Sequence, residues 1–105
     1  TKEDRIPIYD TPEGVYEELL LTASDPKNIE PSFIILDPNK ATEIEKPHEG
    51  VEFGFVIEGT IELHLNKETY IIDTGECFFF TPNKKHYIKN KSKNQKAKFI
   101  WIEIF

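Results

Sequence analysis

The sequence predicts an all-β fold in which two sheets pack as a sandwich or closed barrel. Three observations support this prediction. From residue 50 onward, short apolar runs alternate with turn-forming residues, as in proteins built from several short strands. Residues 61–65 alternate strictly between apolar and polar side chains, which is typical of a strand with one buried face. No segment carries apolar residues at the spacing of a convincing helix.

The first half of the chain contains fewer strand signals. Residues 1–14 have few apolar side chains and include Pro7, Pro12 and Gly14, so we expect an irregular N-terminal arm, with a single domain over residues 15–105. Residues 15–23 predict a first strand and residues 24–28 a turn. Residues 32–37 contain the apolar run F-I-I-L and predict a fully buried strand, and residues 41–46 predict an extended polar loop.

Strand signals are clearer in the second half. Residues 53–58 and 60–65 predict two strands on either side of Gly59. Asn66 and Lys67 form a two-residue hairpin candidate, because asparagine tolerates positive φ. Residues 68–72, 76–80, 86–89 and 97–105 complete a set of about eight strands.

Composition sets limits on the class of protein. A chain of 105 residues can bury one hydrophobic core but not two. The single cysteine, Cys77, excludes an intrachain disulfide and favours a reducing compartment. No apolar run approaches the ~18–20 residues needed to cross a bilayer, so we expect a cytoplasmic protein without membrane contact. The chain starts at Thr1 and contains no methionine, and we therefore expect it to be part of a longer reading frame.

The net charge of −6 is unevenly distributed. Residues 84–105 carry seven lysines and one acidic residue, Glu103, whereas the rest of the chain is acidic. Lysines without arginines, beside an acidic remainder, make a poor surface for nucleic acid. We interpret them as a solvated strand edge and loop that oppose aggregation.

Three side chains have the types and positions of metal ligands: His48, Glu52 and His86. His48 and Glu52 are four residues apart, so on one extended strand they point the same way. His86 opens a later strand and can join them only if the sheet curls back on itself. His64 has the parity of Glu62 in its strand, and we expect it to be a surface histidine outside the site.

Two interpretations of these three residues are open. Two neutral imidazoles and one carboxylate suit a divalent metal such as Fe, Mn, Zn or Ni, with the remaining positions left for water or substrate. Alternatively, the pocket is metal-free, and Glu52 is hydrogen-bonded to the histidines or paired with Lys46. Burying Glu52 without a partner would cost several kcal/mol or force its protonation, so something must balance its charge.

Aromatic residues on the same strands predict a cavity for a small organic ligand. Strand parity directs about half of them inward, and for most of them the competing interpretation is simple core packing. The ligand-binding candidates are Phe53, Phe55, Phe79, Tyr87 and Trp101.

The order of these residues resembles the two signatures of the cupin superfamily. The first signature falls on Lys46, His48, Glu52 and Gly59, with Lys46 in place of the usual first histidine. The second falls on Gly75, His86 and Asn90, and its middle reads Thr81-Pro82-Asn83, where Asn stands for Gly. The resemblance covers roughly the last three-fifths of the chain and implies a double-stranded β-helix, or jelly-roll barrel. It says less about chemistry, because one fold hosts many functions.

The spelling P-H-E-G-V-E-F-G-F-V-I-E-G further resembles the C-terminal cupin domain of bacterial regulators with a lambda-repressor-like helix-turn-helix domain. This resemblance implies a sensor that binds a small-molecule effector and contacts DNA only through an upstream domain absent from this chain. A homodimer would suit such a regulator, and the apolar strand at residues 99–105 offers a surface for it. The alternative is a small metal-dependent cupin enzyme, such as a dioxygenase, isomerase or decarboxylase. We favour the sensor over the enzyme.

Overall fold

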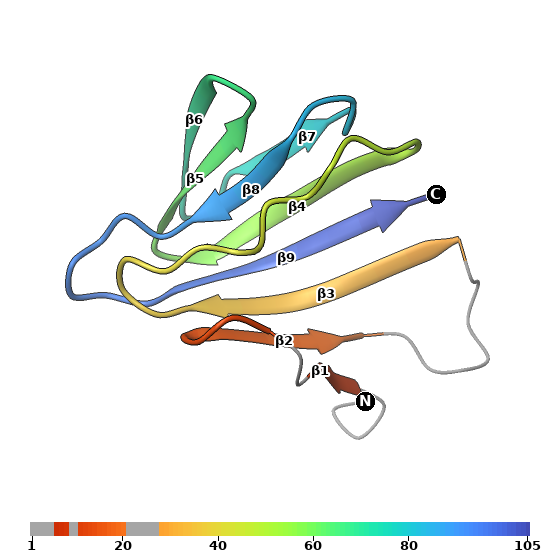
Figure 1. Cartoon of the computed structure of the whole chain (residues 1–105). Helices are drawn as coiled ribbons and strands as arrows, with labels where there is room; N and C mark the ends of the chain where they lie inside the picture. Colours follow the sequence, from red (N-terminus) through yellow and green to blue (C-terminus); the bar gives the residue numbers. More distant parts are fainter. Residues whose placement is uncertain (1–5, 9–10, 21–27) are drawn as a thin grey trace.

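The structure is a computed structural model that describes residues 6–8, 11–20 and 28–105. These ranges contain nine strands and no helix (Figure 1). None of the described residues belongs to a helix that could span a membrane. The strands are β1 (Ile6–Ile8), β2 (Val15–Leu19), β3 (Ile29–Leu36), β4 (Val51–Glu58), β5 (Thr60–Leu65), β6 (Glu68–Asp73), β7 (Cys77–Phe80), β8 (His86–Lys89) and β9 (Ala97–Ile104).

The strands form two sheets, and every pairing between the strands named above is antiparallel. The larger sheet has the order β1-β2-β3-β9-β4-β7, and the smaller has the order β6-β5-β8. In Figure 1 the larger sheet runs from β1 to β7, and the β5–β6 hairpin lies far from the β1–β2 edge. The all-β jelly-roll prediction is therefore confirmed.

The hydrophobic core fills the space between the two sheets. Each sheet directs alternate side chains inward, as the strand period of two requires. On β9 the buried residues are Ala97, Phe99 and Trp101, while the residues between them are only partly covered. The remaining core residues are Val15, Ile34, Leu36, Val56, Ile61, Leu63, Ile72, Phe78, Phe80 and Ile88.

The N-terminal segment differs from the irregular arm expected for residues 1–14. Ile6–Ile8 forms β1, which pairs with β2 at the edge of the larger sheet. An edge strand tolerates Pro7 because one side of it needs no hydrogen-bond donor. Of the first predicted strand, residues 21–23 lie outside the described residues, as do residues 24–27 of the predicted turn.

Gly59 connects β4 to β5 in a left-handed conformation with φ of 83°. A Cβ atom at this position would lie 2.8 Å from the carbonyl oxygen of Lys96. The turn therefore requires both the positive φ and the small size of glycine. This accounts physically for the glycine that ends the first signature.

Asn90 ties the end of β8 to the end of β3. Its side chain is 1% exposed, and its Nδ2 donates to the carbonyl oxygens of Leu36, Asp37 and Gln95 at 3.1, 3.3 and 2.7 Å. Its Oδ1 accepts a hydrogen bond from the backbone N–H of Ser92 at 3.1 Å. The asparagine that ends the second signature is thus a structural residue and lies outside the cluster described next.

Candidate functional site

His48, Glu52 and His86 come together between the two sheets. Glu52 lies on the inner face of β4, His86 opens β8, and His48 lies in the loop before β4. The backbone N–H of His48 donates to the carbonyl of Pro82 at 2.8 Å, which fixes this loop against the segment leading to β8. Glu52 and His86 have side chains with no solvent exposure.

The three side chains meet at one oxygen atom. Glu52 Oε2 lies 2.8 Å from His48 Nε2 and 3.0 Å from His86 Nε2. The histidine rings are 5.2 Å apart, and the ring of Phe80 lies 5.3 Å from that of His86. The predicted convergence of two histidines and one glutamate is therefore present in the structure.

Glu45 is a fourth member of the cluster that sequence reasoning missed. Its Oε2 lies 2.8 Å from His86 Nε2 and 3.5 Å from His48 Nε2. The backbones of Glu45 and His86 also exchange two hydrogen bonds, of 2.8 and 3.1 Å. Neighbouring residues on an extended segment point in opposite directions, so Glu45 faces inward while Lys46 is exposed. The signature spacing drew attention to position 46, and strand parity was the signal that could have identified Glu45.

Hydrogen bonds orient both imidazole rings. His86 Nδ1 lies 2.8 Å from the carbonyl oxygen of Lys84, and His48 Nδ1 lies 3.0 Å from that of Glu49. A carbonyl accepts only from an N–H, so each Nδ1 carries the proton when the ring is neutral. Each Nε2 then directs a lone pair toward the carboxylates, which is the arrangement found in metal-binding histidines.

Four lone-pair atoms therefore face one another in a small volume. The donor atoms of Glu45, His48, Glu52 and His86 all lie within 4.8 Å of one another. Neither oxygen of Glu52 nor Nε2 of His48 has a partner with hydrogen-bond geometry among the described residues, despite the short distances. Neighbouring ligands of an octahedral ion bound at about 2.1 Å are about 3 Å apart, close to these spacings. The donor set therefore fits a divalent metal ion.

A proton is the alternative cation at this position. Burial acts to lower the pKa of His86, but Glu45, Glu52 and the carbonyl of Lys84 outweigh it and raise the pKa to about 10. Burial likewise acts to raise the pKa of Glu45, but His86 and His48 outweigh it, and the pKa is lowered. In the protein without metal, His86 is therefore an imidazolium at neutral pH, and a metal must displace its proton.

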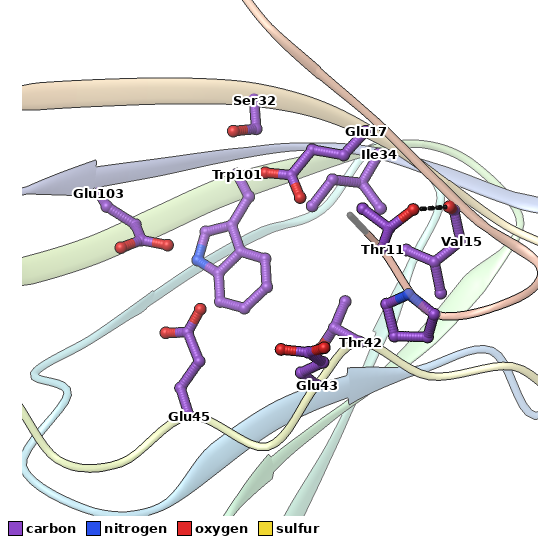
Figure 2. A pocket seen from close by; sticks show the side chains of 11 residues that line it. Thr11, Val15, Glu17, Ser32, Ile34, Thr42, Glu43, Glu45, Trp101 and Glu103 are labelled. Atoms are coloured by element: carbon purple, nitrogen blue, oxygen red, sulfur yellow. Dashed lines mark hydrogen bonds between the residues drawn. The ribbon is translucent and has the colours of Figure 1, made fainter. Parts of the chain in front are cut away.

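A cavity of about 120 Å³ lies next to the cluster (Figure 2). We predicted an aromatic lining, but among the described residues of this lining Trp101 is the only aromatic one, and four are glutamates. The indole nitrogen of Trp101 is buried and has no hydrogen-bond partner among the described residues. The lining residues are Thr11, Pro12, Val15, Glu17, Ser32, Ile34, Thr42, Glu43, Glu45, Trp101 and Glu103.

Two of these glutamates have raised pKa values. Burial, followed by the charges of Glu45, Glu52 and Glu30, raises the pKa of Glu103 to about 8. Burial also raises the pKa of Glu17, with an opposing contribution from the hydroxyl of Ser32 and a further rise from Glu45 and Glu30. At neutral pH Glu103 is therefore mostly protonated, and the cavity gathers carboxyl groups whose ionisation a nearby cation would favour.

The other four ligand-binding candidates do not line this cavity. Phe53 and Phe55 have the opposite parity to buried Glu52 on β4, so they lie on the outer face of the larger sheet with Phe79. They line a separate apolar groove of about 270 Å³. Tyr87 has the opposite parity to His86, and its ring stacks on His64 at 4.4 Å. Sequence reasoning placed these residues on the correct strands but could not assign their faces.

His64 lies outside the cluster, as the alternation of β5 predicted. Its Nε2 lies 3.0 Å from Glu62 Oε1, and its Nδ1 lies 3.2 Å from the hydroxyl of Thr69. These two contacts give each ring nitrogen a hydrogen-bond partner, and the ring also stacks on Tyr87. His64 is therefore a useful reference residue for experiments on the cluster.

The protein is a two-sheet antiparallel jelly roll, and histidines and glutamates gather between its sheets. These features are typical of the small β-barrel proteins to which cupins belong. The profile of the cupin domain family matches residues 32–103, and the chain belongs to this family. The comparison with curated proteins gave no match.

Solved structures with the same fold include two transcriptional regulators and a predicted decarboxylase. A cupin domain of an XRE family transcriptional regulator from Enterobacter cloacae is 21% identical, with a TM-score of 0.76 over 89% of this chain and 98% of that one. An HTH_3 family transcriptional regulator from Vibrio cholerae is 19% identical, with a TM-score of 0.75 over 88% of this chain. The match covers 51% of the regulator, so this chain spans about half of its length.

A predicted oxalate decarboxylase from Thermotoga maritima is 18% identical, with a TM-score of 0.81 over 100% of this chain and 96% of that one. At these identities the likeness shows a shared fold.

Proposed function

We propose that this cupin domain is the effector-binding sensor domain of a bacterial helix-turn-helix transcription regulator. DNA is contacted by a separate domain that precedes it in the chain, and the protein works in the cytoplasm. The likeness to the cupin domains of two such regulators supports this proposal. The amino-acid sequence around His48 and Glu52, which resembles that of regulator cupin domains, supports it as well.

The main observation behind the proposal is that the N-terminal part of the domain forms one wall of the cavity. Thr11, Pro12, Val15 and Glu17 line the cavity, and they belong to the segment between β1 and β2 or to β2 itself. β2 and β1 form the edge of the larger sheet. A ligand in the cavity would therefore contact the part of the domain that connects to any preceding domain.

This arrangement offers a physical route from ligand to DNA. An effector can shift a conformational equilibrium only by binding one state more tightly than the other. Contacts to Thr11 and Glu17 would differ between two positions of the β1–β2 edge, whereas contacts to Trp101 in the centre of the sheet would not. A difference of about 1–3 kcal/mol between states is the usual range for such coupling, or about 5- to 150-fold in affinity.

A test of this proposal uses the protein made from its native reading frame, including whatever precedes Thr1. Its affinity for DNA from its own promoter region is measured by fluorescence anisotropy across a panel of small metabolites. We expect at least one compound to change the DNA affinity by about fivefold or more. Unchanged affinity across the panel, or no sequence-specific DNA binding, would contradict the sensor function.

The second candidate is a small metal-dependent enzyme. The cluster of Glu45, His48, Glu52 and His86 opens toward a cavity, as a catalytic metal centre requires, and this observation favours it. The test is turnover of a candidate substrate by the metal-loaded domain, lost in both His48→Ala and Glu52→Gln. Such turnover would replace the sensor function.

We also propose that the domain forms a homodimer through the outer face of the larger sheet. Apolar residues occupy neighbouring positions across four strands there, in the rows Phe33–Ile100–Phe55–Cys77 and Pro31–Ile102–Phe53–Phe79. Phe55 is 43% and Phe79 is 69% exposed. Monomeric proteins rarely expose a continuous apolar surface of this kind. A second copy of the same face would cover it by a two-fold contact.

Replacement of Phe79 by serine should convert the dimer to monomer. The substitution removes an aromatic side chain that is 69% exposed on this apolar face, and a few residues carry most of the binding energy of such a contact. The measurement is sedimentation equilibrium at micromolar concentration. The matched control is Ile71→Ser, which replaces an apolar residue that is 58% exposed on the smaller sheet and should leave the dimer intact. A monomeric wild-type protein would contradict the proposed dimer.

A further inference from the structure

We infer that the cavity beside the cluster selects a small organic cation that carries an ammonium group and an acceptor oxygen, such as a short amino alcohol or amino amide. This inference rests on the proposed sensor function and gives the chemical class of its effector. Three features of the cavity support it: uncompensated carboxylates, a buried donor without a partner, and a small volume with apolar walls.

Apart from Glu45, which contacts His86, the cavity glutamates have no lysine beside them in the described part of the chain. Figure 2 shows the side chains of Glu17, Glu43 and Glu103 around Trp101. Among the described residues, no lysine lies within ion-pair distance of any of these three. The lysines that do form ion pairs contact Asp37, Glu58, Glu62 and Glu68 elsewhere on the surface. Glu17 and Glu103 are partly buried and Glu43 is exposed, and a cation beside these carboxyl groups would favour their ionised forms, whereas an anion would oppose them.

Trp101 supplies the second, independent requirement. Its side chain is 4% exposed, and its Nε1 is buried without a partner in the described part of the chain. The indole N–H is a donor only, so its partner must be an acceptor. A buried donor left unpaired is costly, and a ligand oxygen placed here would satisfy it. An ammonium group alone has no lone pair to offer, which is why the ligand needs both groups.

Size and the apolar walls distinguish an organic cation from a bare metal ion. An apolar cavity of about 150 Å³ holds benzene, so about 120 Å³ accommodates roughly five or six non-hydrogen atoms. Val15, Ile34 and the ring of Trp101 offer apolar contact to methylene groups between the ammonium and the oxygen. An aromatic ring is also a favourable neighbour for an organic ammonium. A metal ion would use neither the apolar walls nor the indole N–H.

The experiment measures binding of three small organic compounds and of calcium to the 105-residue chain by isothermal titration calorimetry at pH 7, after bound metal has been removed with a chelator and the chelator removed by dialysis. The probes are 3-amino-1-propanol, 1,3-propanediol, 3-hydroxypropanoate and calcium chloride. We expect 3-amino-1-propanol to bind at least tenfold more tightly than each of the others. Equal or tighter binding of the diol, the anion or calcium would overturn the inference.

Variants of the cavity assign the binding site. Glu17→Gln and Glu103→Gln should each weaken binding of 3-amino-1-propanol about tenfold, and Trp101→Phe should weaken it by a similar factor. Glu13→Gln, at an exposed position outside the cavity, is the matched control and should leave it unchanged. Undiminished binding in both glutamine variants would overturn the assignment, even if Trp101→Phe fails to fold.

This experiment separates the inference from the function on which it rests. If 3-amino-1-propanol binds in the cavity but leaves the DNA affinity of the native-frame protein unchanged, the ligand class stands and the sensor function fails. If other compounds change the DNA affinity and the amino alcohol does not bind, the sensor function stands and the ligand class is wrong.

Discussion

Replacement of His86 by alanine should weaken binding of Mn(II), Ni(II) or Zn(II) by more than about 100-fold. Loss of an outer-shell partner of a metal ligand already costs about 10- to 100-fold in affinity, and His86 is itself a proposed ligand. The substitution also removes the residue to which Glu45 is bound. The measurement is calorimetric titration, with metal analysis of the purified protein. His64→Ala is the matched control, because His64 lies on the opposite face of its sheet and should leave metal affinity unchanged.

The same titration should depend on pH in the wild-type protein. His86 has a pKa of about 10 without metal, so binding at pH 7 must displace its proton. The affinity should therefore rise with pH, by about tenfold per unit between pH 6 and 8, and about one proton should be released per ion. Stoichiometric metal retained in His86→Ala would refute the ligand assignment, and a pH-independent affinity would refute the proton competition.

Replacement of Asn90 by alanine should destabilise the domain by about 3–4 kcal/mol. The side chain is buried, and its removal leaves three carbonyl oxygens and the N–H of Ser92 short of a partner. Each buried polar group without a partner costs about 1–3 kcal/mol, and some relaxation is expected. At about 4–8 °C per kcal/mol for a domain of this size, the melting temperature should fall by roughly 12–30 °C. Thermal and urea unfolding measured by circular dichroism provide the check.

Asn94 provides the control for this prediction. It lies in the same loop and is exposed, and its side chain accepts one hydrogen bond from the hydroxyl of Ser92 at 3.2 Å. Asn94→Ala should therefore change the free energy of unfolding by less than about 0.5 kcal/mol. Similar effects of the two substitutions would show that the buried hydrogen bonds of Asn90 contribute little to stability.

The fold was largely predictable because its determinants are local. Short apolar runs, the strict alternation at Thr60–Leu65 and the turn at Asn66 and Lys67 each specify structure within a few residues. Asn66 has the positive φ of 57° that the hairpin suggested. β1 was missed because three residues with one proline carry little signal by themselves. Their pairing with β2 is a contact between segments, which local patterns do not encode.

The cluster was predictable to the extent that it follows the two signatures. His48, Glu52 and His86 meet as expected, whereas Glu45 joins them through a backbone bridge between the loop and His86. The signature spacing directed attention to position 46, and only the alternation along this extended segment would have pointed to position 45. The aromatic residues were placed on the right strands but not on the right face of the sheet. Phe53 and Phe79 each lie on a predicted strand, and only the parity set by buried neighbours such as Glu52 assigns their face. The wall of the acidic cavity comes from four segments that are distant in the sequence, so local patterns could not predict it.

The proposed metal centre has the carboxylate of Glu45 where a third histidine could stand, and this difference changes its formal charge. A divalent ion held by three neutral histidines and one glutamate keeps one positive charge, and it attracts anions by charge alone. With Glu45, His48, Glu52 and the neutral form of His86 as donors, the two carboxylates cancel the ion. A water molecule bound to such a centre would be less acidic than one bound to a centre with a net positive charge. The centre would also have no electrostatic preference for an anionic ligand. The donor set thus makes the centre an electrically neutral neighbour to a cavity that is itself rich in carboxylates.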